Sequence, residues 1–216
     1  MDPNRHEPVP HPAVRRLSLY LRQLEAFARA GRQTVSSKQL GESIGSTDAQ
    51  VRKDLGYFGQ FGHPGIGYRV QELIEQLRHI LGTDRIWNVL LVGAGNLGRA
   101  LAAYKGFERK GFKLVAVFDA DNTKVGQKQG DFPVHGMNEL AQTIEQLQIR
   151  LGIIAVPADA AQGVADQLVA AGIKGILNFA PVSLSVPPRI AQEAVDLAVQ
   201  LEQLSFQVSF ASGGQG

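Results

Sequence analysis

Cysteine is absent from this sequence of 216 residues, and histidine occurs only five times. Without cysteine there is no disulfide framework, no thiolate nucleophile and no cysteine-ligated metal site. The histidines lack the close spacing of zinc ligands, so we expect no metal site. They are His6, His11, His63, His79 and His135.

Long apolar runs are missing as well. No stretch approaches the ~20 apolar residues of a membrane span, and the opening MDPNRHEPVPHP has no apolar signal-peptide core. We therefore expect no membrane contact and a cytoplasmic location. Hydrophobic residues still make up 44% of the chain, in short runs interrupted by many of the 24 glycines. This composition is typical of an α/β fold.

The stretch VSSKQLGESIGSTDAQVRKDLGYFG, residues 35–59, predicts two short helices joined by a tight turn. Capping boxes at residues 36–39 and 47–50 start the helices near Ser37 and Asp48. The apolar residues share one face of the pair, which is the layout of a helix-turn-helix. They are Leu40, Ile44, Val51, Leu55 and Phe58.

The second of these helices carries polar side chains away from its apolar stripe. Gln, Arg and Lys bond the edges of bases, and hydroxyls at a helix start meet phosphates. The candidate DNA-binding residues are Ser46, Thr47, Gln50, Arg52, Lys53 and Tyr57. The alternative is an ordinary solvated helix face.

The segments on either side complete a winged helix-turn-helix domain. An amphipathic helix begins at Ala13 and ends before Gly31. The stretch FGQFGHPGIGYRV, residues 58–70, predicts a β-hairpin around a Gly-His-Pro-Gly turn, which would be the wing. Residues 71–81 form one more amphipathic helix.

The stretch NVLLVGAGNLGRAL, residues 88–101, contains the pattern G-x-G-x-x-G between a predicted strand and a predicted helix. Gly93 permits the tight turn, Gly95 lets a pyrophosphate approach the backbone, and Gly98 lets the helix pack on the sheet. The bare N–H groups of the helix start then face the phosphates. We predict the helix to continue to Gly111.

The next predicted strand ends at Asp119, about 20 residues after Gly98, where an acid accepts from ribose hydroxyls and repels the extra phosphate of NADP. The candidate cofactor-binding residues are Gly93, Ala94, Gly95, Asn96, Leu97, Gly98 and Asp119. The predicted regulatory ligand is NADH or NAD⁺. Strands and helices then alternate, so we expect a Rossmann-like, doubly wound parallel sheet.

Catalytic machinery for a dehydrogenase is not evident. Residues 183–216 contain no His, Lys or Tyr, and no Tyr-x-x-x-Lys pair occurs in the chain. A dinucleotide site without an acid–base pair, joined to a DNA-binding module, indicates a sensor and no catalytic residues. Two alternatives stay open: a small NAD-dependent oxidoreductase, and a DNA-binding regulator that senses another adenine nucleotide.

From about Arg16 to about Val208 the chain resembles the Rex family of redox-sensing transcriptional repressors. The most specific blocks are RLSLYLR, VSSKQLGESIG, QVRKDLGYFGQFG, GIGY, GAGNLGRAL, AGIKGILNFAP and LSF. The resemblance implies a homodimer that binds palindromic double-stranded operator DNA and releases it when NADH binds. It places Arg52 and Lys53 in the major groove, and it implies that the last helix, around residues 197–208, is exchanged between subunits.

The resemblance also implies a polar triad that couples nucleotide to DNA, with Arg22, Tyr104 and Asp196 as its members here. Two departures stand out. Pro64 occupies the wing tip where the family usually has a basic residue, which implies an altered minor-groove contact. Leu197 stands where relatives often place an aromatic residue near the nicotinamide pocket.

Together these patterns divide the chain into four parts. We predict a flexible tail over residues 1–12 and a winged-helix DNA-binding domain over residues 13–82. A Rossmann NAD(H)-binding domain follows over residues 83–192, and a dimer-swapped C-terminal helix with its tail occupies residues 193–216.

Overall fold

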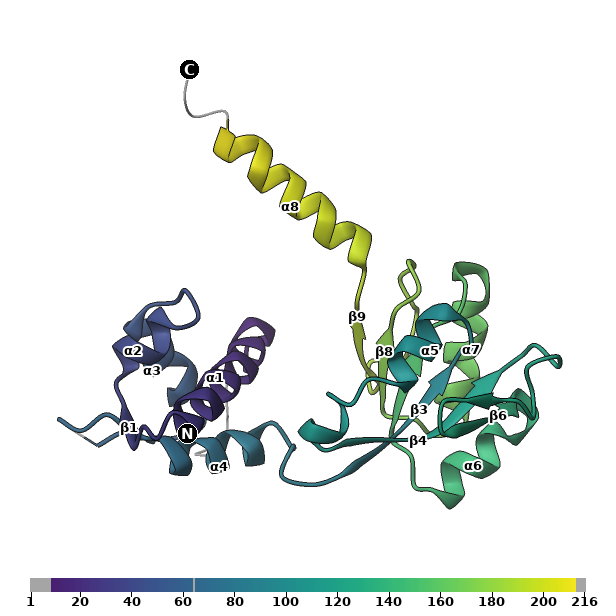
Figure 1. The fold of residues 1–216 in the computed structure, drawn as a ribbon, viewed down its shortest axis with the longest axis horizontal. Coiled ribbons are helices and arrows are strands. Elements are labelled where there is room, and N and C mark those ends of the chain that lie inside the picture. Colours follow the sequence, from purple (N-terminus) through teal and green to yellow (C-terminus); the bar gives the residue numbers. More distant parts are fainter. Residues whose placement is uncertain (1–8, 64, 213–216) are drawn as a thin grey trace, which may run out of the picture. The chain divides into compact units, whose positions relative to one another are not determined.

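The structure is a computed structural model that describes residues 9–63 and 65–212 (Figure 1). The chain divides into two compact units, Met1–Arg85 and Ile86–Gly216. Across the described ranges, no helix has both the length and the apolar character that a membrane span requires.

The first unit contains the predicted helices in the predicted order. Its elements are α1 (His11–Arg29), β1 (Thr34–Val35), α2 (Ser37–Glu42), α3 (Asp48–Gly56), β2 (Tyr68–Arg69) and α4 (Val70–Ile80). Helix α1 begins at His11, so the tail predicted for residues 1–12 extends too far. The prolines do not prevent this, because proline fits the first turn of a helix, where an N–H has no partner to lose. Residues 1–8 lie outside the described residues.

A single apolar core holds the helices of the first unit together. Helix α1 packs along α4, and both helices of the helix-turn-helix pair, α2 and α3, contact α1. The residues that are fully buried there come from all four helices: Leu17, Leu24, Leu40, Val51, Val70 and Leu77. The predicted inward face of α2 and α3 is therefore confirmed, with Ile44 and Phe58 packed at its margin.

The wing was predicted as a hairpin of two paired strands, and this prediction is wrong for the described residues. Strand β2 pairs with β1, with Val35 opposite Tyr68, and both side chains are buried. In the described part of residues 58–67, only an isolated bridge joins His63 to Gly67. The wing arms contain four glycines, which supply no side chains for cross-strand contacts, so pairing there gains little. Pro64 lies outside the described residues.

A buried carboxylate joins α1 to α3. Both oxygens of Asp54, which is fully buried, accept from the Arg16 guanidinium at 2.6 and 2.8 Å, and Oδ2 also accepts from the Tyr20 hydroxyl at 2.9 Å. Burial raises the pKa of Asp54, but the hydrogen bonds from Arg16, Gln50 and Tyr20 outweigh it, and the net pKa is lowered. Asp54 is therefore ionised at neutral pH.

The second unit is built on a seven-stranded sheet in the order β5-β6-β4-β3-β7-β8-β9. Its strands are β3 (Trp87–Val92), β4 (Phe112–Asp119), β5 (Lys128–Gln129), β6 (Phe132–Gly136), β7 (Leu151–Ile154), β8 (Gly175–Asn178) and β9 (Ala191–Ala194). All neighbours are parallel except β5, which runs antiparallel to β6. The chain order reverses between β3 and β7, which confirms the predicted doubly wound sheet.

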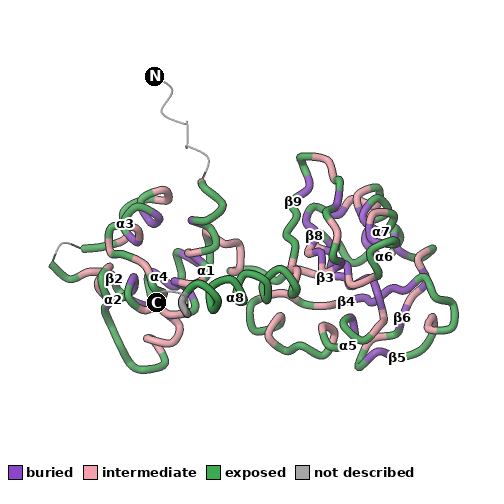
Figure 2. The backbone as a smooth tube through the Cα atoms, turned by 90° about the horizontal axis from the view of Figure 1, so that it is seen from above, coloured by how far each residue is buried: buried purple, intermediate pink, exposed green. Residues whose placement is uncertain are grey.

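The two faces of this sheet are covered unequally. The helical elements are α5 (Asn96–Ala102), η1 (Glu108–Lys110), η2 (Met137–Glu139), α6 (Leu140–Gln146), α7 (Ala158–Ala170) and α8 (Leu197–Ser212). Leu90 and Val92 of β3 point into a large core shared with α6 and α7. Val89 and Leu91 point to the other face, where α5 and the segment around Phe107 give thinner cover. Figure 2 shows purple buried residues within the sheet and a green α8.

The end predicted for α5 is wrong, and one strand of this unit was not predicted. Helix α5 ends at Ala102 instead of reaching Gly111, and the chain turns after the C-cap Ala103 before η1 begins at Glu108. Strand β9 was not predicted, since all four of its residues are exposed and show no apolar alternation. The boundary expected after residue 192 falls within β9, and α8 starts at Leu197.

The ion pair of Asp54 predicts acid sensitivity. Because its folded pKa is lowered, ionised Asp54 stabilises the fold above the unfolded pKa of about 3.9, and this contribution is lost as pH falls through the folded pKa. We expect Asp54→Asn to lower the free energy of unfolding by about 3 kcal/mol at pH 7, because Arg16 loses its partner. The difference from wild type should shrink between about pH 5 and pH 3.

Urea unfolding followed by circular dichroism at a series of pH values measures this difference. If the difference in free energy of unfolding between wild type and Asp54→Asn stayed constant down to pH 3, it would contradict the assignment of Asp54 as an ionised, stabilising acid.

Candidate functional site

The turn between β3 and α5 is shaped by two glycines without which it cannot close. Gly93 has φ +110°, and its N–H donates to the Phe118 carbonyl at 2.8 Å. A Cβ on Gly98 would overlap the carbonyl oxygen of Gly93, and one on Gly93 would overlap that of Ala155. The glycines at these positions are therefore required by backbone contact alone.

Gly95 differs from its two neighbours in this turn. It is the N-cap of α5, with extended backbone at φ −81°, and a Cβ there would meet nothing within 4 Å. The fold itself does not require glycine here. Open space in front of a backbone N–H at a helix start is what a phosphate group needs for close approach.

The predicted acid at the end of β4 stands beside this turn. Asp119 Oδ2 accepts from the Ala94 N–H at 2.7 Å and lies 3.2 Å from Lys124 Nζ, while Oδ1 accepts from the Asp121 N–H at 2.8 Å. Burial raises the pKa of Asp119, and these hydrogen bonds lower it further than burial raises it. An ionised carboxylate has about four acceptor positions, so the three donors leave Asp119 room for one more.

The other residues of the turn lie at the surface. Asn96 is exposed, and its Oδ1 accepts from Arg99 at 2.8 Å. Leu97 is 39% exposed, whereas Gly98 is buried against the sheet. The structure thus brings the predicted cofactor-binding residues together at the carboxyl edge of β3 and β4, where ligands of such sheets bind.

On α3, the predicted DNA-binding side chains divide by exposure. Arg52 and Lys53 are exposed, and the small residues Ala49 and Gly56 share that exposed side of the helix. Small residues next to two cations allow a helix backbone to enter a groove closely. Tyr57, at the C-cap, is half-buried.

The two hydroxyls at the start of α3 have internal partners. Thr47 Oγ1 caps the helix by accepting from the Gln50 N–H at 3.1 Å. The Ser46 side chain faces the Tyr20 hydroxyl and partly offsets the burial that raises the pKa of Tyr20. Both residues were predicted to meet phosphates; these contacts give them a first role in the fold.

The capping box predicted at residues 47–50 is wrong in its second half. The Gln50 side chain does not return to Thr47; its Nε2 donates to Asp54 Oδ1 at 2.7 Å. A hydrogen bond to a buried carboxylate is charge-assisted and outweighs one to an exposed backbone N–H. The box predicted at residues 36–39 is confirmed.

Arg52 is also held by an acid that the sequence analysis did not single out. Its Nη1 donates to Asp48 Oδ2 at 2.8 Å and to Ser37 Oγ at 3.0 Å. The hydrogen bond from Arg52 is the main reason why the pKa of Asp48 is lowered. Asp48 is four residues from Arg52, and Asp54 is four residues from Gln50. This i,i+4 spacing on a helix is the sequence signal from which both contacts could have been predicted.

The three residues of the predicted triad lie in exposed or half-buried positions. Arg22 is exposed on α1. Tyr104 is 58% exposed and meets the Phe107 ring edge-on at 5.1 Å between centroids. Asp196 Oδ1 accepts from the N–H groups of Ala198 and Val199 and so caps α8.

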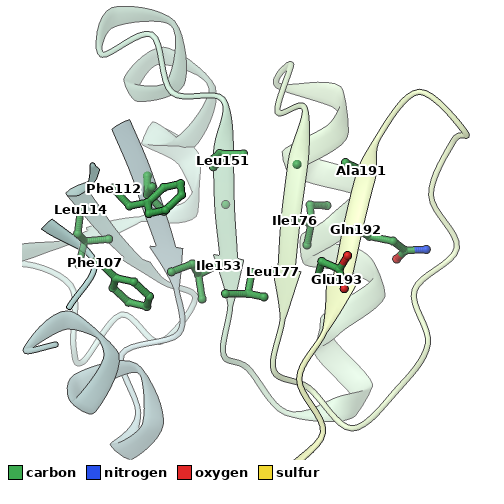
Figure 3. Close-up of a pocket in the computed structure, with 13 residues that line it drawn as sticks. Phe107, Phe112, Leu114, Leu151, Ile153, Ile176, Leu177, Ala191, Gln192 and Glu193 are labelled. Carbon is green, nitrogen blue, oxygen red and sulfur yellow. The ribbon is translucent and has the colours of Figure 1, made fainter. Parts of the chain in front are cut away.

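A groove of about 390 Å³ lies on the thinly covered face of the sheet (Figure 3). Its labelled apolar side chains are Phe107, Phe112, Leu114, Leu151, Ile153, Ile176, Leu177 and Ala191. At the β9 end it is bordered by Gln192 and Glu193. The lining of the groove is almost entirely apolar, so another apolar surface could cover it favourably.

Helix α8 carries two apolar stripes on opposite sides. Leu197, Leu201, Leu204 and Val208 follow one another at intervals of four, three and four residues and form the first stripe. The second stripe is Val199, Phe206 and Phe210, in which the two rings stack at 4.2 Å between centroids. All seven side chains are at least 40% exposed.

Among the described residues, no three His, Asp or Glu side chains gather in a way that would hold a metal ion. Two histidines are paired with single acids instead: His79 with Asp84 at 2.8 Å and His135 with Glu139 at 3.0 Å.

Two family models match separate parts of the chain. The family described as "Putative DNA-binding protein N-terminus" matches residues 8–56, which include α1, α2 and α3. The family described as "CoA binding domain" matches residues 84–182, which include the glycine turn and Asp119.

Relatives match over nearly the full length. The redox-sensing transcriptional repressor Rex of Carboxydothermus hydrogenoformans is 50% identical over 200 residues, covering 93% of this chain and 96% of the relative.

The crystal structure of RSP, a Rex-family repressor, in complex with β-NAD⁺ and operator DNA has a TM-score of 0.89 at 39% identity, covering 97% of this chain and 99% of RSP. The structure of RSP with β-NADH has a TM-score of 0.85 at 39% identity, covering 94% of this chain and 96% of RSP. Identity of this extent over both units means that the chain belongs to the Rex family of redox-sensing transcriptional repressors.

Proposed function

We propose that this protein is a transcriptional repressor that binds palindromic operator DNA as a homodimer and is released by NADH. One observation carries the proposal: the chain combines the glycine turn and the exposed α3 with 39% identity to a repressor crystallised with β-NAD⁺ and operator DNA and again with β-NADH. It would thereby report the NADH/NAD⁺ ratio of the cytoplasm.

The dinucleotide binds along the edge formed by the glycine turn and Asp119. The pyrophosphate approaches Gly95 and the N–H groups at the start of α5, and Asp119 accepts from a ribose hydroxyl with its remaining acceptor position. Lys124 Nζ lies 3.2 Å from Asp119 Oδ2, so a ribose bound to Asp119 would either contact Lys124 or displace it. Ala94, Asn96 and Leu97 complete this edge.

DNA binds the exposed side of α3. Lys53 and Arg52 supply the cations, Gln50 supplies an amide, and Ser46, Thr47 and Tyr57 flank the helix. Arg22, Tyr104 and Asp196 couple the two events. By linkage, operator DNA must weaken NADH binding by the same factor by which NADH weakens DNA binding, and a coupling of about 3 kcal/mol corresponds to roughly 150-fold.

The homodimer forms through α8. The first stripe of α8 matches the apolar groove in character, and the second stripe, on the opposite side of the helix, requires cover of its own. An α8 exchanged between two copies satisfies these demands symmetrically, because each copy both gives a helix and receives one.

The family model for a CoA binding domain favours a second candidate ligand, since coenzyme A and NAD share an adenine nucleotide. The protein would then be a DNA-binding regulator that senses another adenine nucleotide. A role without catalysis is supported by the relatives, which are named as repressors.

The first test is release of DNA. With a fluorescently labelled palindromic duplex at fixed salt, we expect NADH to lower the anisotropy of the complex at concentrations where NAD⁺ and coenzyme A do not. Equal release by all three ligands, or by coenzyme A alone, would refute redox sensing. Oxidation of NADH with a carbonyl substrate, followed by its absorbance, would refute the role without catalysis.

A second test compares two glycines of the turn. Gly95→Ala should keep the thermal stability of wild type, because its Cβ has open space, yet bind NADH at least about tenfold more weakly because the methyl group meets the pyrophosphate. Gly98→Ala should lose stability as well, because its Cβ overlaps a backbone oxygen. Calorimetric titration and thermal unfolding measure both. Wild-type NADH affinity in Gly95→Ala would place the phosphates elsewhere.

A third test concerns the dimer. Leu204→Glu puts a charge into the first stripe of α8, where burial of an unpaired charge is costly, and should yield monomers of 23.3 kDa in light scattering. Gln200→Glu adds the same charge between the stripes and should leave the dimer intact. Dimers of unchanged strength in Leu204→Glu would exclude α8 from the interface.

A further inference from the structure

The amide of Gln50 is held by a buried acid of the same helix, α3. Asp54 is fully buried, and its Oδ1 accepts from Gln50 Nε2 at 2.7 Å while Arg16 and Tyr20 occupy its other acceptor positions. Gln50 is half-buried and gives up the return bond of a capping box for this contact. Its side chain is therefore anchored at one end.

The chemistry of Asp54 decides which end of the amide is anchored. A carboxylate paired with Arg16 is an acceptor only, so it binds the nitrogen of Gln50 and repels the oxygen. Oε1 must then turn away from Asp54. Because an amide nitrogen carries two hydrogens, one N–H of Gln50 also remains for another partner. Gln50 thus has one free acceptor, Oε1, and one free N–H donor, and the contact with Asp54 fixes which of the two lies where.

This order matches one base. In the major groove adenine presents the N6 amine as donor and N7 as acceptor, whereas guanine presents two acceptors, O6 and N7. We propose that Gln50 reads an adenine in each half of the operator and that Asp54 is the positioning residue that fixes its amide for this contact. The inference rests on the proposed DNA-binding function and adds the base that is recognised and the residue that sets it.

Arg52 and Lys53 do not share this arrangement. Arg52 is held by the exposed pair Asp48 and Ser37, and neither side chain has a hydrogen bond to Asp54 among those of the described residues. Variants of the Asp54 group should therefore change the reading of a single position. Fixing a long side chain before binding also lowers the conformational entropy that binding would cost.

The test is selection of binding sites from a pool of random DNA duplexes by the full-length protein. Wild type should select a palindromic motif with an adenine in each half. In wild type we expect a preference of about tenfold for adenine over guanine at that position. Gln50→Leu should lose this preference and keep the base preferences at the other positions. Tyr20→Phe is the matched control: it removes the hydroxyl that bonds Asp54 and faces Ser46, leaves Gln50 Nε2 in place, and should keep the preference for adenine.

Asp54→Asn tests the positioning role. An asparagine amide offers both a donor and an acceptor, so Gln50 is free to turn over, and adenine and guanine should become nearly equal at that position only. A DNA-side measurement avoids any folding defect: 7-deazaadenine at the selected position should weaken wild-type binding about tenfold and leave Gln50→Leu unchanged.

Two outcomes would overturn the inference. If Gln50→Leu selects the same motif as wild type, or if 7-deazaadenine has no effect on wild type, Gln50 only supports Asp54 in the fold, and the proposed repressor function stands. If wild type selects no motif at all, the proposed function fails, and the inference fails with it.

Discussion

The second unit depends on the contact between the backbone of Gly98 and the carbonyl oxygen of Gly93, which leaves no space for any side chain. This contact brings the start of α5 against the end of β3 and sets the direction in which α5 leaves the sheet. The helix is short and ends at Ala102, so one face of the sheet receives only thin cover. The short helix that follows this turn thus leaves the apolar groove open.

Carboxylates play the same part in both units. Asp54 and Asp119 are buried, and the pKa of each is raised by burial and lowered more strongly by donors around it, so each stays ionised inside the protein. Asp54 fixes an amide and a guanidinium at the helix that we propose reads DNA. Asp119 fixes the Ala94 N–H at the glycine turn. In each unit a buried, ionised acid gives a surface segment a defined conformation, which lowers the entropy lost when a ligand binds.

Much of this fold was predictable because the signals are local. Gly93 and Gly98 are required by backbone geometry, Ser36 by a cap, and the strands of the parallel sheet by short buried runs. The errors arose where distant residues decide. Strand β2 pairs with β1 because Val35 and Tyr68 bury one another, and Gln50 leaves its cap because α1 brings Arg16 and thereby holds Asp54 ionised. The predicted nucleotide and DNA contacts remain predictions, since their partners are other molecules.

The two apolar stripes of α8 have a consequence for how the protein is made. Helix α8 follows β9 in the chain, so during translation the first unit and all strands of the second unit leave the ribosome before it does. The exposed apolar side chains of α8 therefore emerge after every residue that lines the groove. Chains translated from the same messenger RNA emerge close to one another at that moment. For the homodimer that we propose, the order of elements thus favours capture of each new α8 by a finished neighbour over nonspecific association of half-made chains.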